Sequence, residues 1–174
     1  MALVLHTFEA DDDIEFPSAT ELISAEFEVD SSRNKPADVL WTSLLKPAPE
    51  FSAWFRFCEE DPEMDYYNPN RGHVYDDRNL SYLAISDVSD LSKLERFICD
   101  GRIDHEAIAQ VYDGFFLGEK MVGHELFAQK NDAWDVESQA IYKPRKLIPK
   151  ATLILDASAQ GVVSQVNQLL AESS

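Results

Sequence analysis

Apolar and polar residues alternate in short segments along the chain, and the period of alternation changes from two to about 3.6 between segments. Phe27 and Val29 alternate with acidic residues, which is the period-two pattern of a half-buried strand. Runs rich in β-branched and aromatic residues indicate further strands, and residues 151–156 form the clearest one. We expect strands at residues 2–8, 26–30, 37–43, 80–86, 114–117, 136–142 and 151–156.

The clearest helical stripe lies between residues 50 and 60. Phe51, Trp54, Phe55 and Cys58 occupy positions i, i+3, i+4 and i+7, which predicts an amphipathic helix that faces the core. We expect three further helices: one after Ser89 or Asp90 that ends at Gly101, one from Asp104 to Tyr112, and one over residues 161–172.

A long polar stretch, residues 61–79, is expected to form a loop. It contains Pro62, Pro69, Gly72 and His73 together with three tyrosines. A loop of this length in a compact domain is often functional, although simple mobility is the alternative. Six or seven short strands with four helices, and no internal repeat or linker, predict one α+β domain over residues 1–174.

Charge narrows the classes of partner. The chain has 15 Lys and Arg residues against 32 Asp and Glu residues, a formal net charge of −17 at pH 7. Broad nucleic-acid binding requires Lys and Arg to neutralise phosphates, so the composition argues against it. A basic partner or a small ligand fits the charge better.

The two cysteines and the hydropathy pattern indicate a compartment. Cys58 and Cys99 lie in apolar amphipathic stretches without a second cysteine or histidine at metal spacing, so we expect both to be buried, reduced thiols. We find no signal peptide and no apolar run long enough to span a bilayer. We therefore expect a soluble, cytoplasmic protein without a metal site and without membrane contact.

The sequence lacks a Gly-rich phosphate loop, a zinc pattern and a nucleophile elbow. Its candidate chemistry is dispersed over three places, each with a purely structural alternative. His6 and Thr7 end the first strand, where a histidine can simply bond the backbone. Trp41, Thr42 and Ser43 end a later strand, where Trp41 can be core and the hydroxyls can cap a turn, and Glu137, at the start of a late strand, can be a solvent-facing edge residue.

The order and context of these residues resemble the ADP-ribosyltransferases, nearest to bacterial or phage members with a His/Glu-type site. Val4-Leu-His-Thr7 is similar to the family's first-strand motif, and Leu40-Trp-Thr-Ser43 is similar to its second. Residues 137–148 followed by 152–155 look like the family's catalytic-Glu strand, Pro-containing turn and next strand. Residues 103–114 look like the passage from helix to strand that precedes it. The resemblance implies a split, mostly antiparallel sheet and an enzyme that uses NAD as a substrate.

The resemblance also implies a role for each residue. Glu137 would stabilise the oxocarbenium-like ribose that forms as nicotinamide leaves, because a fixed carboxylate is most useful where positive charge develops. His6 would bind the adenosine-side ribose, Thr7 and Thr42-Ser43 would hold hydroxyl or amide groups, and Trp41 or a loop tyrosine would pack on nicotinamide. The pyrophosphate would need one of four loop cations, which are Arg33, Lys35, Arg71 and Arg78.

Three features depart from the family pattern. The first-strand residue is His6 in place of Arg, whereas Thr42 and Ser43 are closer to the branch that has Arg. The acidic pair before the late strand is Asp135 and Glu137 in place of two glutamates. The macromolecular acceptor, protein or nucleic acid, and a role in toxicity or defence stay open.

A rival interpretation comes from two acidic runs, Asp11-Asp12-Asp13 and Glu59-Glu60-Asp61. The whole chain would then be a non-catalytic acidic binder, such as an antitoxin, an immunity protein or a nucleic-acid mimic, that captures a basic protein. The two hypotheses differ in what they require. A transferase needs His6 and Glu137 to face one pocket, whereas a binder needs a continuous acidic face.

Overall fold

The computed structural model describes residues 2–11, 13–129 and 133–174, so Asp12 of the first acidic run lies outside it. The chain forms two compact units, which we describe separately. Unit 1 comprises Met1–Ala25, Thr42–Asn79 and Arg145–Ser174, and unit 2 comprises Glu26–Trp41 and Leu80–Pro144.

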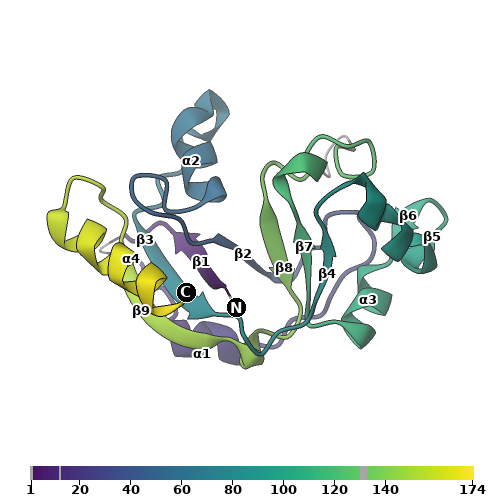
Figure 1. The fold of residues 1–174 in the computed structure, drawn as a ribbon, viewed down its shortest axis with the longest axis horizontal. Helices are drawn as coiled ribbons and strands as arrows, with labels where there is room; N and C mark the ends of the chain where they lie inside the picture. The colour runs from purple at the N-terminus through teal and green to yellow at the C-terminus, as the bar shows by residue number, and fades with distance from the viewer. Residues whose placement is uncertain (1, 12, 130–132) are drawn as a thin grey trace. The chain divides into compact units, whose positions relative to one another are not determined.

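Unit 1 is built on an antiparallel sheet in the order β2-β1-β3-β9 (Figure 1). The strands are β1 (Leu3–Phe8), β2 (Leu40–Leu44, of which Thr42 to Leu44 belong to this unit), β3 (Arg71–Asp76) and β9 (Ile148–Ile154). Because successive side chains of a strand point to opposite faces, Leu3 and Leu5 of β1 share one face, and both belong to the buried core. Strand β3 lies between β1 and β9.

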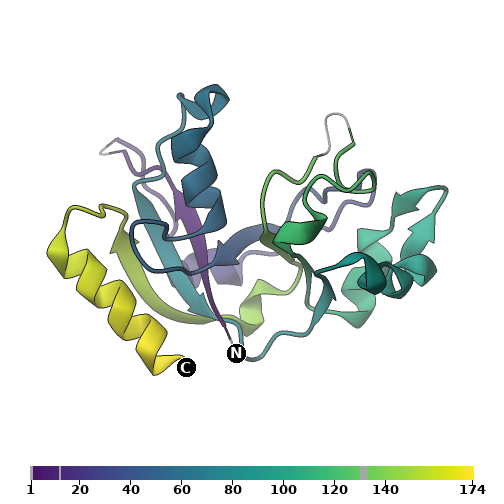
Figure 2. The ribbon, with the colours of Figure 1, turned by 45° about the horizontal axis from the view of Figure 1, so that its top comes forward.

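Two helices contribute to the core of unit 1. Helix α2 (Ala53–Glu60) buries Phe55 and begins after Ser52, whose Oγ accepts the Phe55 N–H at 3.1 Å. Helix α4 (Gln160–Glu172) adds Val166 to the same cluster as Leu5, Val74 and Leu153. Both helices, with the 3₁₀ turn η1 (Pro62–Met64) that follows α2, can be followed in Figure 2.

The short helix α1 (Ala19–Ser24) and the residues just before it are hydrogen-bonded to β3. The Tyr75 hydroxyl donates to the Ala19 carbonyl at 3.2 Å, and His73 contacts the Pro17 carbonyl at 2.9 Å. His73 and Tyr75 are two residues apart on β3, so they point to the same face, opposite to the face of Val74 and the core. Residues 16–24 therefore cover the second face of this sheet.

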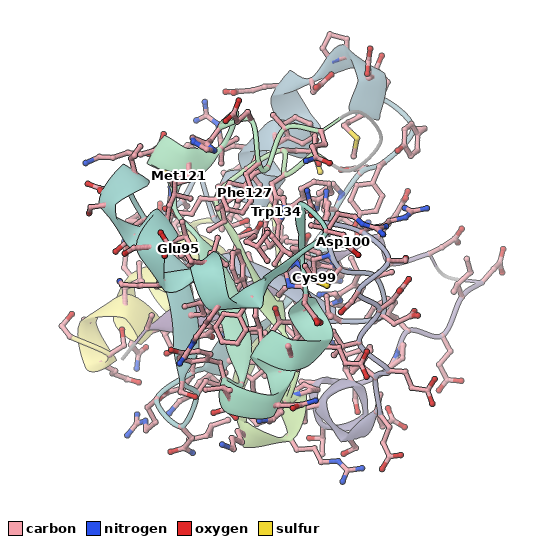
Figure 3. The ribbon with its side chains drawn as sticks, turned by 90° about the vertical axis from the view of Figure 1, so that its right-hand side faces the viewer. Glu95, Cys99, Asp100, Met121, Phe127 and Trp134 are labelled. Atoms are coloured by element: carbon pink, nitrogen blue, oxygen red, sulfur yellow. The ribbon has the colours of Figure 1, made fainter. Side chains whose placement is uncertain are left out.

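Unit 2 has a mixed sheet in which β4 (Tyr82–Ile85) runs parallel to β7 (Gly114–Leu117), and β7 runs antiparallel to β8 (Ser138–Ile141). Its core includes Phe115, Phe127 and Trp134, with Phe127 and Trp134 labelled together with Met121 in Figure 3. Helix α3 (His105–Val111) begins after Asp104, whose carboxylate accepts the Ala107 N–H at 2.9 Å.

Short 3₁₀ segments and a hairpin complete the unit 2 connections. The strands β5 (Ile98–Cys99) and β6 (Arg102–Ile103) are joined by Asp100 and Gly101, both at positive φ (50° and 75°), as a tight hairpin turn requires. Figure 3 labels Cys99 and Asp100 at this turn. The 3₁₀ segments are η2 (Val88–Lys93), η3 (Glu95–Phe97) and η4 (Glu119–Met121), and η5 (Pro144–Lys146) follows where the chain returns to unit 1.

A buried polar network ties the loop around Asn34 to the unit 2 core. The Asn34 carbonyl is 2.7 Å from His105 Nε2 and accepts the Trp134 indole N–H at 3.4 Å, while its side-chain oxygen accepts the Ile103 N–H at 2.9 Å. Because a carbonyl can only accept, Nε2 of His105 carries a proton, and Nδ1 lies 2.6 Å from the Tyr142 hydroxyl. Buried polar groups are therefore paired here within a mainly apolar interior.

Several predictions from the sequence are confirmed. The structure is α+β, and within the two units every strand pair of the described chain is antiparallel except β4 with β7. Strand β7 has the expected bounds, and the other elements found at or near their expected positions are β1, β2, β4, β8, β9, α2, α3 and α4. Among the described residues, no helix is both long and apolar enough to cross a membrane.

Four local predictions were wrong. Residues 26–30 form no strand; the helix α1 precedes them, and Asp30 makes only an isolated bridge to Ala37. The expected loop 61–79 contains η1 and the strand β3, because pairing with β1 and β9 on both sides overrides its polar composition. The expected helix ending at Gly101 consists of η2, η3 and the β5–β6 hairpin, and Cys99 in that hairpin is exposed, whereas Cys58 is buried as predicted.

Candidate functional site

Glu137 is the residue immediately before β8 in unit 2. The sequence predicted it at the start of this strand, so the prediction is off by one position. The Glu137 side chain is half-buried. The next residue, Ser138, pairs with Leu117 of β7, and its hydroxyl donates to the Val136 carbonyl at 3.1 Å. The backbone on the carboxyl side of Glu137 is therefore fixed by a strand pair, and the chain bends at residues 136–137.

A cation and two indoles hold the segment that leads to Glu137. Lys35 Nζ donates to the Ala133 carbonyl at 3.0 Å and to Asp135 Oδ2 at 2.9 Å. The same Nζ lies 5.6 Å from the centre of the Trp41 ring, which contacts Trp134 edge to face at 4.8 Å between ring centres. Trp41 and residues 133–135 are thus brought together within unit 2. Residues 133–135 precede Glu137 in the sequence.

These contacts define what we call the Trp41 cluster, consisting of Lys35, Trp41, Trp134 and Asp135. Trp41 is only partly buried although it packs against the unit 2 core, so it serves as a core residue and also keeps some ring surface exposed. Lys35 and Asp135 are about one-third exposed, at 31% and 35% of their side chains. Asp135 of this cluster lies two residues before Glu137, so the cluster fixes the segment of chain that leads to Glu137.

His6, Thr7, Thr42 and Ser43 belong to unit 1 and divide between the two faces of its sheet. The register pairs Leu5 with Ser43, and directly opposed residues share a face, so Ser43 and Thr7 lie on the core face with Leu5. His6 and Thr42 lie on the opposite face. All of these except His6 are buried, with Thr42 and Ser43 exposed by only 3% and 2%.

His6 lies directly across from His73, which the sequence placed in a loop. The His6 ring stacks on Phe16 at 6.2 Å between centres, and Phe16 stacks in parallel on Phe8 at 3.8 Å. His73 is buried; its Nδ1 is 2.9 Å from the Thr152 hydroxyl and its Nε2 is 2.9 Å from the Pro17 carbonyl. Burial lowers the pKa of His73, because the charged imidazolium is poorly solvated there.

The four cations proposed for a pyrophosphate differ in their contacts. Arg78 is bonded to the carboxylate of the buried Asp76, and Arg71 donates to the Asn70 carbonyl at 3.1 Å. Lys35 pairs with Asp135, as described above. Arg33 is exposed. Arg33 and Lys35 are the two of these that belong to unit 2, the unit of Glu137.

Metal ligands do not gather in the part of the chain that the structure describes: there, no group of three or more His, Cys, Asp or Glu residues is placed to hold an ion. Comparisons with known proteins add no further constraint. No protein-family model matches the chain, and no curated protein or solved structure matches it. The resemblance to ADP-ribosyltransferases therefore depends on the sequence motifs alone.

Sequence reasoning proposed Glu137, Trp41 and His6 as site residues, which stay predictions, and it missed two residues close to Trp41 and His6. Lys35 appeared only as one of four loop cations, because its contacts with Trp41 and Asp135 join residues up to 100 positions apart. His73 had a local signal, since it alternates with Tyr75 in a period-two pattern. The polar and glycine residues around it concealed that pattern.

Proposed function

We propose that this chain is an NAD-dependent ADP-ribosyltransferase that modifies a macromolecule, with Glu137 as its catalytic carboxylate. The main support is the position of Glu137: it is half-buried, precedes a paired strand, and follows a segment held by the Trp41 cluster. A carboxylate on a rigid support stabilises developing positive charge without having to reorganise during the reaction.

The chemistry required of Glu137 is electrostatic. The bond between C1′ of the ribose and the nicotinamide nitrogen breaks, its electron pair leaves with nicotinamide, and positive charge develops on the ribose. Glu137 stabilises that charge until a nucleophile of the acceptor bonds to C1′ and gives up its proton. The exposed part of the Trp41 ring offers an apolar surface for the planar nicotinamide.

His6 is assigned to NAD binding on the resemblance and is tested separately, since it belongs to unit 1. His6 is our first choice there, because it is partly exposed. Thr42, on the same face, and Thr7 and Ser43, on the core face, are secondary candidates because all three are buried.

The test pairs two isosteric variants that are two residues apart. Glu137→Gln removes the proposed catalytic charge, and Asp135→Asn removes a charge that contacts only Lys35 in our assignment. NAD binding is measured by calorimetry, and nicotinamide release is measured in the same samples. We expect release in the wild type, loss of release by at least about 100-fold in Glu137→Gln, and a smaller loss, below about 10-fold, in Asp135→Asn, which only weakens the Lys35 contact that holds the preceding segment. We also expect weaker NAD binding in His6→Ala.

Equal losses of nicotinamide release in Glu137→Gln and Asp135→Asn would contradict the assignment of Glu137 as the catalytic carboxylate. No NAD binding and no release by the folded wild type would favour the non-catalytic acidic binder. That second candidate is supported by exposed carboxylates after β1, at Glu9, Asp11, Asp13 and Glu15. Its signature is capture of a basic protein that weakens steeply with salt.

A further inference from the structure

The segment from the start of α2 to Tyr67, residues 53–67, includes η1 and presents aromatic rings that the core does not use. We call this segment the aromatic lobe. Trp54 and Phe57 lie one helical turn apart with their ring centres 5.5 Å from each other, and both are partly exposed. Neither is among the described residues that form or line the unit 1 core, which takes Phe55 from the same helix.

The lobe is a fixed structure. The Asp61 N–H donates to the Phe57 carbonyl at 3.0 Å, and the Tyr67 N–H donates to the Met64 carbonyl at 2.8 Å, so the backbone is bonded throughout. The Tyr67 hydroxyl also reaches the Thr7 carbonyl of β1 at 3.5 Å. Burial raises the pKa of Tyr67, which agrees with a packed position for its ring.

Tyr66 completes the exposed aromatic surface. Its side chain is 79% exposed, although its hydroxyl contacts the Met64 sulfur at 3.7 Å. Exposed large apolar side chains that gather in one segment typically mark contact sites, whereas single ones are ordinary. Trp and Tyr are also the residues most often responsible for binding energy in interfaces.

Carboxylates surround these rings in sequence and along the helix. Five of the seven residues from Glu59 to Asp65 are acidic, and all but Asp61 are classed as exposed. Glu60 and Asp61 lie three and four residues after Phe57, on the same side of the helix end. Arg56, the one basic residue of the lobe, is paired with Glu60.

We propose that the aromatic lobe binds a basic segment of another polypeptide, with arginine side chains stacked on Trp54, Phe57 and Tyr66. Guanidinium groups stack on aromatic faces and pair with carboxylates, so one side chain type satisfies both features of the surface. The charge excludes the other occupants: a second copy would set one acidic lobe against another, and phosphate-bearing lipids or nucleic acids carry the same sign.

Binding by the lobe does not depend on the transferase proposal. If that proposal holds, a basic polypeptide is the acceptor class that the lobe selects, and this identification rests on the proposed function. The peptide-binding experiment below has a readout other than turnover, so either inference can fail alone.

The experiment measures fluorescence anisotropy of two labelled twelve-residue peptides, alternating Gly-Arg and alternating Gly-Lys, with the intact protein at physiological salt. The two peptides have equal charge, so pure charge attraction gives equal affinities. We expect the arginine peptide to bind about 3-fold to 10-fold more tightly, and we expect Trp54→Leu and Tyr66→Leu each to reduce its affinity about 2-fold to 5-fold and to diminish the preference.

A charge-matched pair of triple variants separates the lobe from the general acidity of the chain. Glu59→Lys, Glu63→Lys and Asp65→Lys alter the lobe, whereas the control alters three exposed glutamates of unit 2, Glu106, Glu119 and Glu125, in the same way. Both sets change the net charge equally. We expect the lobe set to weaken binding at least about 10-fold and the control set less than about 3-fold.

Equal losses in the two triple variants would overturn the inference, as would equal affinity for the two peptides. Dimerisation of the wild type that Trp54→Leu abolishes, seen by sedimentation, would assign the surface to a second copy and also overturn it. Peptide binding that persists in Glu137→Gln, together with no nicotinamide release by the wild type, would keep this inference and reject the transferase. Circular dichroism confirms that each variant is folded.

Discussion

The Tyr142 hydroxyl lies 2.6 Å from Nδ1 of His105, a side chain with no exposed surface in the core of unit 2. The other ring nitrogen lies 2.7 Å from the Asn34 carbonyl, so each ring nitrogen has a hydrogen-bond partner. Burial raises the pKa of Tyr142, which keeps its proton on the hydroxyl.

Tyr142→Phe keeps the ring and removes this one hydroxyl. The buried His105 Nδ1 then loses its hydrogen bond with Tyr142, and we expect the free energy of unfolding to fall by about 1 to 3 kcal/mol. Urea denaturation followed by circular dichroism measures the loss. The control is Tyr112→Phe, since the Tyr112 hydroxyl contacts only the exposed Arg96 at 3.4 Å; a change within about 0.5 kcal/mol is expected there. Losses of the same size at both sites would contradict the importance of the His105 bond.

Substitution by alanine is expected to change stability in opposite directions at two glycines. A Cβ on Gly72 of β3 would lie 2.5 Å from Leu5 Cδ1 and 3.3 Å from Leu5 Cγ, inside the unit 1 core. Gly72→Ala must move Leu5, and we expect it to lower stability by about 1 to 3 kcal/mol. Gly161→Ala, in the first turn of α4 with no atom within 4 Å of the new Cβ, should raise stability by up to about 1 kcal/mol. Thermal unfolding of both variants measures these changes in stability. A stabilising effect of Gly72→Ala would contradict the packing described.

The sequence predicted best those elements whose signal is local. The stripe of Phe55 and Cys58 located α2, and Ser52 then caps it, while the run from Gly114 to Leu117 matched β7. Strand β3 was missed because its stability comes from neighbours on both sides, 67 residues earlier and about 80 residues later at His73. Such pairing leaves only a weak signal, the alternation of His73 with Tyr75, in a segment rich in glycine and polar residues.

The candidate site, like the fold, was predicted only where the signal is local in the sequence. A motif placed Glu137 within one residue of β8, but motifs carry no information on register, so they did not show which of Thr42 and Ser43 faces the core. The stripe of α2 correctly assigned Phe55 to the core and also assigned Trp54 there. The register of a short helix on its sheet decides between neighbouring side chains, and it left Trp54 partly exposed.

The lowered pKa of His73 predicts a loss of stability in mild acid. Because the folded pKa lies below 6.5, the unfolded chain binds the proton more tightly; the contribution of neutral His73 is complete above pH 6.5 and is lost as the pH falls through the folded pKa. We expect the urea midpoint to decrease between pH 7.5 and pH 5 in the wild type, and to decrease less in His73→Gln. The comparison of variants removes the contribution of the other histidines, and a parallel decrease in both proteins would exclude His73 as the cause.

The lowered pKa of Asp76 predicts a second loss of stability, at a lower pH than the loss expected from His73. Its carboxylate is 1% exposed, and its pKa is lowered chiefly by hydrogen bonds from Arg78, with Lys150 Nζ 3.6 Å away. A lowered folded pKa means that this stabilisation is present above pH 3.8 and is lost as the pH falls through the folded value. Arg78→Gln should therefore cost about 1 to 2 kcal/mol at pH 7, because it leaves a buried carboxylate with fewer donors.

The difference between Arg78→Gln and the wild type should shrink as the pH falls below 3.8, since protonated Asp76 no longer attracts the guanidinium. Arg56→Gln is the matched control, because Arg56 pairs with Glu60 at an exposed position, where an ion pair contributes about 0 to 1 kcal/mol. Urea titrations at pH 7, 4 and 2.5 provide the three comparisons, and the lowest pH lies well below 3.8. A deficit of Arg78→Gln that stays constant over this range would mean that Arg78 stabilises unit 1 through its stem and not through the charge on Asp76.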